Sequence, residues 1–373
     1  MRYLPGLNTL RLYAALCVVI THIESYGWYF IQHDALRPIV PYFTLSAQDA
    51  VTLFFVLSGF LITHLLLLER RETGDIHALH FYFRRSLRIF PLYYLFVILT
   101  VLVLSSKIIP LPPNYAVDSQ PLTWLAILFF SSHIPAAFTS LGFMNHLWSI
   151  GVEEWFYLAW GALVKRVNLL VLISMIIVGR LVIVAVLAPQ ALFAAYPDPL
   201  STFLKYTRFE CMAIGALGAW LVSSQHPGLQ WVYRLERVAL LLMLILIVLP
   251  LGEDGGAIYH LAISVLFMCL IVNVSTNKQA AVTLEHPVLS RWGNITYGVY
   301  MWHPFTIYFV SAIFSIFAGS LLGNIALYVA IIGVTLLVAR VSYDLYETPF
   351  LKLKSRGAPK LHIEVAEVPS TPN

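Results

Sequence analysis

Long apolar runs separated by short polar segments repeat from one end of the chain to the other. Most are about 20 residues long, which is what an α-helix needs to cross a bilayer. The pattern predicts ten transmembrane helices, near 10–30, 46–68, 89–106, 143–164, 167–188, 203–223, 237–252, 256–273, 294–317 and 322–345. A shorter apolar piece, 122–134, is expected to lie at the membrane interface or to re-enter. The fold class predicted is therefore all-α, a polytopic integral membrane helical bundle.

Composition supports this prediction. Of the 373 residues, 59% are hydrophobic and 11% are charged, and that charged fraction is about half of what soluble domains carry. The formal net charge of +4 comes from basic loops, and no basic stripe alternates with aromatic residues, so no nucleic-acid partner is expected. The three cysteines lie far apart inside apolar segments, which predicts packing roles and neither a metal site nor a disulfide framework.

The distribution of lysine and arginine predicts the orientation in the membrane. With the N-terminus inside, the loops near 69–88, 165–166, 224–237 and 274–293 and the C-terminal tail hold nearly all the basic residues outside the spans. The opposite loops hold little more than Arg37 and Lys107. Cytoplasmic loops are enriched in basic residues, so both termini are predicted to be cytoplasmic. The expected division is a transmembrane domain, 1–352, and a short tail, 353–373, disordered at its end.

Three arginines, Arg84, Arg85 and Arg88, precede Pro91 in the stretch FYFRRSLRIFPLYYLF. This places them at the predicted cytoplasmic face, with Pro91 near a helix start, where proline is tolerated. Guanidinium groups there suit a phosphate-rich ligand. Basic clusters beside a span also fix topology or contact anionic headgroups. The cluster alone leaves both interpretations open.

Ionisable residues inside spans are costly, so each is a candidate functional residue. Arg11 and His22 are eleven residues apart in the first span, close to three whole helical turns, so they share one face with His22 about 16 Å deeper. In the fourth span His146, Glu153 and Tyr157 share a face. A buried carboxylate such as Glu153 can orient an imidazole and make it an effective base. The alternatives are a core histidine bonded to a neighbouring helix and a structural, charge-compensating carboxylate.

Two further spans carry polar candidates. The stretch YGVYMWHPF holds Tyr300 and His303, which could line a polar wall or pack against neighbouring helices. Arg208, near the outer end of the sixth span, could contact an acceptor, although a side chain snorkelling to the interface is an alternative. Glu347, ahead of Pro349, is expected to be structural, because the proline should end the last helix.

Six stretches in order resemble the membrane-bound acyltransferase-3 family, the O-acyltransferases of bacterial surface and exported glycans. The matching stretches are LPGLNTLRLYAAL, FFVLSGFLI, FYFRRSLRIFPLYY, HLWSIGVEEWFYL, YGVYMWHPF and YETPF, so the resemblance runs from about residue 3 to residue 352. Asn8 departs from the pattern, because the family often has aspartate after Gly-Leu. The departure puts that helix-start contact in doubt but not the assignment.

The resemblance implies transfer of an acyl group, usually acetyl, from cytoplasmic acetyl-CoA to a sugar hydroxyl, with no metal. Carried over residue by residue, it implies that Arg84, Arg85, Arg88 and Arg11 hold the phosphates of the donor. His22 is then the general base or a transient acyl carrier, and Glu153 orients it. Substrate contacts are expected from Trp148, Tyr300, His303 and Arg208, with Tyr300 or Trp148 as a candidate donor to the oxyanion.

Many members of the family carry a fused extracytoplasmic hydrolase-like domain, and the expectation here is the stand-alone form. The protein would acylate a glycan or glycolipid itself or pass the group to a partner protein, and direct acylation is favoured. The expected location is the bacterial inner membrane, with the lipid bilayer as a partner. Three alternatives stay open: a secondary transporter of an anionic substrate, a non-catalytic scaffold of polysaccharide assembly, and the same enzyme class using succinyl-CoA.

Overall fold

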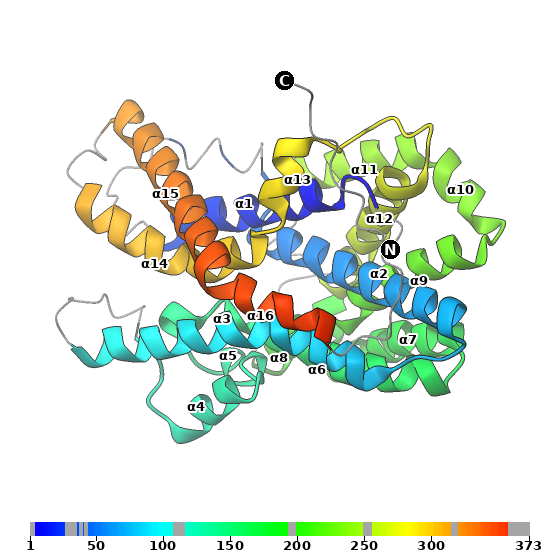
Figure 1. Ribbon diagram of the computed structural model, residues 1–373, viewed down its shortest axis with the longest axis horizontal. Helices are drawn as coiled ribbons and strands as arrows, with labels where there is room; N and C mark the ends of the chain where they lie inside the picture. The colour runs from blue at the N-terminus through cyan, green and yellow to red at the C-terminus, as the bar shows by residue number, and fades with distance from the viewer. Residues whose placement is uncertain are drawn as a thin grey trace.

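The computed structural model describes residues 4–26, 36, 40, 44–106, 116–192, 199–248, 256–314 and 320–356. Within these ranges the fold is all-α, without a strand. Figure 1 shows the helices packed into a bundle. They are α1 (Leu7–Tyr26), α2 (Ala47–Thr73), α3 (Ala78–Ser106), α4 (Pro121–Leu128), α5 (His133–Ala136), α6 (Leu147–Arg166), α7 (Leu169–Leu187), α8 (Pro199–Tyr206), α9 (Phe209–Ser224), α10 (Gly228–Arg234), α11 (Glu236–Val248), α12 (Ala257–Thr276), α13 (Pro287–Gly293), α14 (Thr296–Phe314), α15 (Leu321–Ser342) and α16 (Thr348–Lys352).

Five stretches of the described chain are long and apolar enough to cross a membrane, and each corresponds to a predicted span. They are Ala47–Thr73, Ala78–Leu104, Leu169–Leu187, Ala257–Thr276 and Leu321–Lys352. The full set of ten spans and the cytoplasmic termini stay predictions. The apolar piece at 122–134 forms the short helices α4 and α5, too brief to cross a bilayer.

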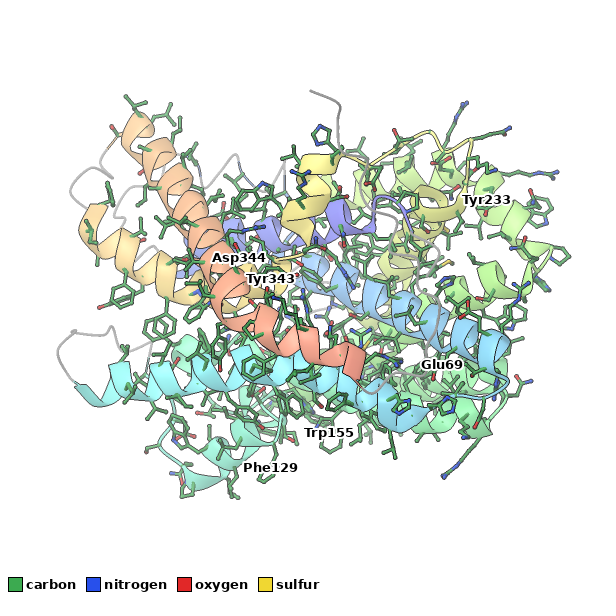
Figure 2. All side chains as sticks on the ribbon, in the orientation of Figure 1. Glu69, Phe129, Trp155, Tyr233, Tyr343 and Asp344 are labelled. Atoms are coloured by element: carbon green, nitrogen blue, oxygen red, sulfur yellow. The ribbon has the colours of Figure 1, made fainter. Side chains whose placement is uncertain are left out.

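The outer surface of the bundle is apolar. Helix α7 exposes one stripe at helical spacing, composed of Val171, Met175, Val178, Val182 and Val186. Phe129 and Trp155, labelled at the lower edge in Figure 2, are also exposed. Large continuous apolar surfaces are rare on soluble monomers, so this surface fits contact with lipid.

Helix α1 lies between two groups of helices (Figure 1). On one side it contacts the pair formed by α14 and α15, and on the other it contacts α2 and α12. Helix α3 contacts α6, α14 and α16. This arrangement brings the polar faces of α1, α2, α3, α6 and α14 around one cavity.

Helices α2 and α9 pack at close backbone contact through glycines. A Cβ atom on Gly59 would lie 1.9 Å from the carbonyl oxygen of Met212, and one on Gly215 would lie 2.0 Å from that of Val56. Small residues at helix–helix contacts in membranes allow this approach. The two glycines thereby fix the position of α2, which carries one wall of the cavity.

We expect Gly215→Ala to destabilise the protein by about 1–3 kcal/mol, because overpacking a tight interface forces the helices apart. Gly179→Ala is the matched control, since a Cβ there meets nothing within 4 Å. Thermal unfolding in detergent should show a lower Tm for Gly215→Ala alone. Equal Tm values for the two variants would contradict the close packing of α2 and α9.

The structure corrects three details of the sequence prediction. Helix α3 begins at Ala78, so the arginine cluster lies within a helix and not in a loop, and Pro91 lies in the helix interior. The predicted span 203–223 is broken into α8 and α9 at Arg208. The last helix does not end at Pro349: a π-helical turn, Tyr343–Glu347, leads directly into α16, where the proline occupies the tolerated first turn.

Candidate active site

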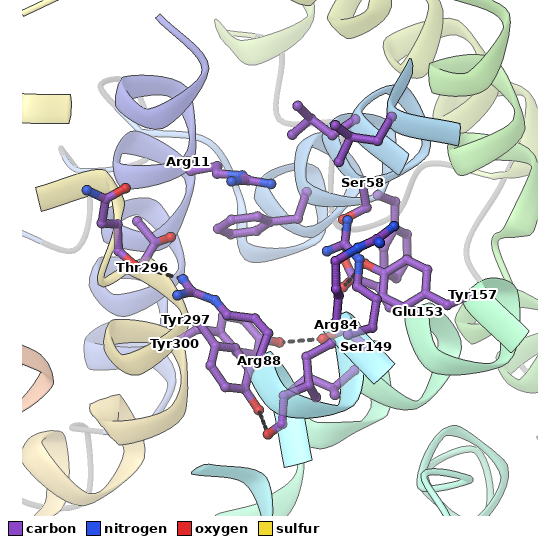
Figure 3. A pocket seen from close by; sticks show the side chains of 18 of the residues that line it. Arg11, Ser58, Arg84, Arg88, Ser149, Glu153, Tyr157, Thr296, Tyr297 and Tyr300 are labelled. Atoms are coloured by element: carbon purple, nitrogen blue, oxygen red, sulfur yellow. Dashed lines mark hydrogen bonds between the residues drawn. The ribbon is translucent and has the colours of Figure 1, made fainter. Parts of the chain in front are cut away.

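A cavity of about 430 Å³ opens among α1, α2, α3, α6 and α14 and carries an excess of positive charge. Figure 3 shows side chains from these helices pointing into it. All four predicted donor-binding arginines line it. The cations are Arg11, Arg84, Arg85, Arg88 and Lys354, and the polar residues include Ser58, Ser149, Glu153, Tyr157, Asn294, Thr296, Tyr297 and Tyr300.

The arginines are held in place chiefly by uncharged groups. Nη2 of Arg88 donates to the backbone carbonyl oxygen of Asn294 at 2.7 Å, and the guanidinium of Arg85 lies over the ring of Tyr157, 5.2 Å from its centroid. Arg84 pairs with Glu69 at 3.2 Å. Among the described residues, Arg11, Arg85 and Arg88 make no salt bridge. The cavity therefore suits an anionic ligand.

Lys354 is a lining residue that sequence reasoning missed. It belongs to a short 3-10 helix, Leu353–Arg356, at the start of the predicted tail, and the rest of that tail lies outside the described residues. Burial, and then the nearby charges of Arg88, Arg85 and Arg84, lower the pKa of its ammonium group to about 8. A basic residue after the last span gives no sequence signal that separates it from a topology determinant.

Donor binding should depend on pH through Lys354. Only the charged ammonium attracts phosphate, so as pH rises through about 8 the KM for an anionic donor should rise by up to about tenfold, the value of one such contact. Lys354→Arg keeps the charge and should flatten the profile, whereas Lys354→Met should show the high KM at every pH. Measuring KM from pH 7 to 9.5 tests this. Identical profiles for the three proteins would exclude Lys354 from the site.

Glu153 lies in the cavity wall with both carboxylate oxygens engaged. Ser58 donates to Oε1 at 3.0 Å, and Tyr157 donates to Oε2 at 2.7 Å. Among the described residues no hydrogen bond joins Glu153 to His22. No direct contact therefore supports the predicted role of Glu153 in orienting His22. Its position beside Arg85, which stacks on Tyr157, fits a role in shaping the wall.

Tyr300 and Ser149 form the part of the wall that we call the inner end of the cavity. Their hydroxyl oxygens lie 2.7 Å apart (Figure 3). Both hydroxyl groups also donate toward the carbonyl oxygen of His146, at 3.0 Å from Tyr300 and 3.2 Å from Ser149. Tyr300 and Ser149 are each about one turn from a histidine: His303 on α14, and His146 at the N-cap of α6. The ring centroid of Tyr300 lies 5.5 Å from that of His146 and 5.6 Å from that of His303, so both imidazoles lie next to the inner end.

His22 and His303 meet beyond this inner end. Nδ1 of His22 lies 2.7 Å from Nε2 of His303, and the two rings lie edge to edge, with centroids 4.9 Å apart and planes inclined by 28°. The ring of His146 lies edge-on to His303, with centroids 5.1 Å apart. We call His22, His146 and His303 the histidine cluster. Helix α1 carries both Arg11, which lines the cavity, and His22, which belongs to this cluster. Among the described residues no group of His, Cys, Asp and Glu could hold a metal ion.

Arg208 and Trp148 do not line the cavity. Arg208 is fully buried and donates to Thr52 at 2.9 Å and to Gln48 at 2.8 Å, so its side chain does not snorkel to the surface. Its guanidinium lies 5.6 Å from the ring centroid of Trp148, and the ring of Trp148 also packs on Tyr206, with centroids 4.6 Å apart. This group sits at the break between α8 and α9. The predicted contacts of Arg208 and Trp148 with substrate stay predictions.

A bundle of apolar helices encloses a cavity lined by cations, and Tyr300 in its wall contacts the rings of His146 and His303. This arrangement defines a membrane protein with an internal cation-lined cavity. The family model described as an acyltransferase domain matches residues 4–343. The chain therefore belongs to the acyltransferase-3 family, and it is a multi-pass membrane protein of that family.

Two relatives from Staphylococcus aureus are named as O-acetyltransferases. The protein named "Putative O-acetyltransferase SACOL0978", from strain COL, is 28% identical over 377 residues. O-acetyltransferase OatA, from strain NCTC 8325 / PS 47, is 26% identical over 383 residues. Each match covers 94% of this chain but 58% of the relative. No solved structure gives a significant match.

Proposed function

We propose that this protein is an O-acyltransferase that moves an acyl group, in the simplest case acetyl, from cytoplasmic acyl-CoA to a hydroxyl of a glycan or glycolipid at the bacterial cytoplasmic membrane. The observation that carries the proposal is the cavity itself. Arg11, Arg85 and Arg88 line it without a carboxylate partner among the described residues, and Tyr300 in its wall contacts the ring of His303, the partner of His22.

The donor would bind with its phosphates at the arginines and its thioester toward the inner end. Coenzyme A is a polyanion, and bonds between phosphate and guanidinium are short, charge-assisted and often bidentate. Burial in a cavity between helices strengthens them, since the effective dielectric constant is low. In this proposal the acyl group passes the pair Tyr300 and Ser149, which lines the cavity next to the histidines.

The proposed chemistry is general base catalysis by His22. The acceptor hydroxyl gives its proton to His22 as its oxygen bonds to the acyl carbon. The carbon–sulfur bond then breaks, and the departing thiolate of coenzyme A takes the proton back from His22. The atoms balance: one ester and one free thiol replace one thioester and one hydroxyl. No further cofactor is needed.

Purified protein in lipid vesicles, given acetyl-CoA radiolabelled in the acetyl group, tests the proposal. We expect free coenzyme A to be released and the label to appear on a lipid-linked glycan supplied as the acceptor. Counterflow of an intact anion without acyl-CoA consumption would support the transporter instead. Release of coenzyme A from succinyl-CoA but not from acetyl-CoA would support the same reaction with a different acyl donor.

A further inference from the structure

The histidine cluster contains a hydrogen-bonded relay that fixes the protonation of each ring. His22 comes from α1 and His303 from α14, 281 residues later in the chain. On its other side, Nδ1 of His303 lies 2.6 Å from the backbone carbonyl oxygen of Tyr300. A carbonyl oxygen can only accept, so Nδ1 of His303 must carry a proton.

The charge state of His303 follows from its surroundings. His303 is fully buried and has no salt bridge among the described residues. An unpaired buried cation is costly, so the ring is neutral. In a neutral imidazole with its proton on Nδ1, Nε2 is an acceptor.

The tautomer of His22 then follows. Because Nε2 of His303 accepts, Nδ1 of His22 must donate across the 2.7 Å contact. We propose that His303 is the positioning residue of the site: by accepting from Nδ1 of His22, it holds that ring in one orientation and places its lone pair on Nε2, the atom that takes the proton from the acceptor. This inference rests on the proposed function. It gives His303 the orienting role that the sequence had suggested for Glu153.

His146 is the third imidazole of this cluster. Its side chain is buried and packs edge-on against His303. The backbone of Phe143 lies within hydrogen-bonding reach of its ring. Among the described residues no side chain bonds to either of its ring nitrogens.

Two variants of similar shape separate positioning from packing. Glutamine can place its carbonyl oxygen near the former Nε2 and accept from His22, whereas methionine has a similar length and is at best a weak acceptor. We expect His303→Met to lower kcat by about 10²–10⁴-fold, as other enzymes lose when a base is held in the wrong tautomer, with the KM for acyl-CoA within about threefold. His303→Gln should keep kcat within about tenfold. Equal kcat values for the two variants would overturn the proposal.

A second measurement does not depend on activity or on the folding of the two His303 variants. Nitrogen-15 NMR of histidine-labelled wild-type protein, with His22→Gln used to assign the His22 signals, reports which ring nitrogen carries the proton. The proposal requires Nδ1 of His22 to be protonated and Nε2 to be unprotonated. The reverse tautomer would overturn it. If the tautomer is as required but acetyl-CoA is not turned over, the proposed function fails and the relay stands.

Discussion

Replacing His22 with alanine is expected to lower the rate of acyl transfer by about 10²–10⁴-fold, the usual contribution of a general base. The loss should fall on kcat, because His22 does not line the donor cavity and contacts His303 beyond its inner end. Steady-state release of coenzyme A, measured on protein purified in lipid, gives both constants.

The matched control is His286→Ala, which removes an exposed histidine with no side-chain cap bond at the start of α13. Both variants should be inserted and folded, and only His22→Ala should lose turnover. Near-normal transfer by His22→Ala would remove this histidine from the mechanism. An equal loss in the control would show that the assay reports folding and not chemistry.

The double variant Arg85→Ala/Arg88→Ala should fail in donor binding. A hydrogen bond to a charged group contributes about 1.5–3 kcal/mol, so losing the two guanidiniums should raise the KM for acyl-CoA by on the order of 100-fold or more. The kcat at saturating donor should change much less, since neither arginine is part of the histidine cluster. Kinetics with varied acyl-CoA separate the two constants.

Arg234→Ala is the control for basic charge, because Arg234 is exposed on α10 and lies over the ring of Trp231, away from the cavity. Its KM should match that of the wild type. If the double variant kept a normal KM but inserted with altered topology, the cluster would serve only to orient the protein in the membrane, which is the alternative that its sequence left open.

The sequence predicted those parts of the site that depend on helical periodicity within one segment. Arg11 lines the cavity and His22 lies beyond its inner end on the same helix, because three turns separate them. The arginine cluster also faces the cavity, although its helix starts earlier than predicted. Five of the predicted spans match helices long and apolar enough to cross a bilayer, because bilayer thickness sets the length of such runs.

What depends on contacts between distant segments could not be read from the sequence. The partner of His22 is His303, and periodicity within either helix says nothing about which helices pair. Lys354 reaches the cavity because a π-helical turn continues the last helix into α16, which packs along α3. The break at Arg208 was missed because no Gly or Pro stands next to it in the stretch KYTRFE.

The most direct test of the account is the structure of the protein in lipid bound to a non-hydrolysable thioether analogue of acetyl-CoA. The account predicts phosphates against Arg84, Arg85, Arg88 and Lys354, with the acetyl carbon past Tyr300 and within reach of Nε2 of His22. Phosphates bound elsewhere, or an acetyl group that points away from the histidine cluster, would contradict it.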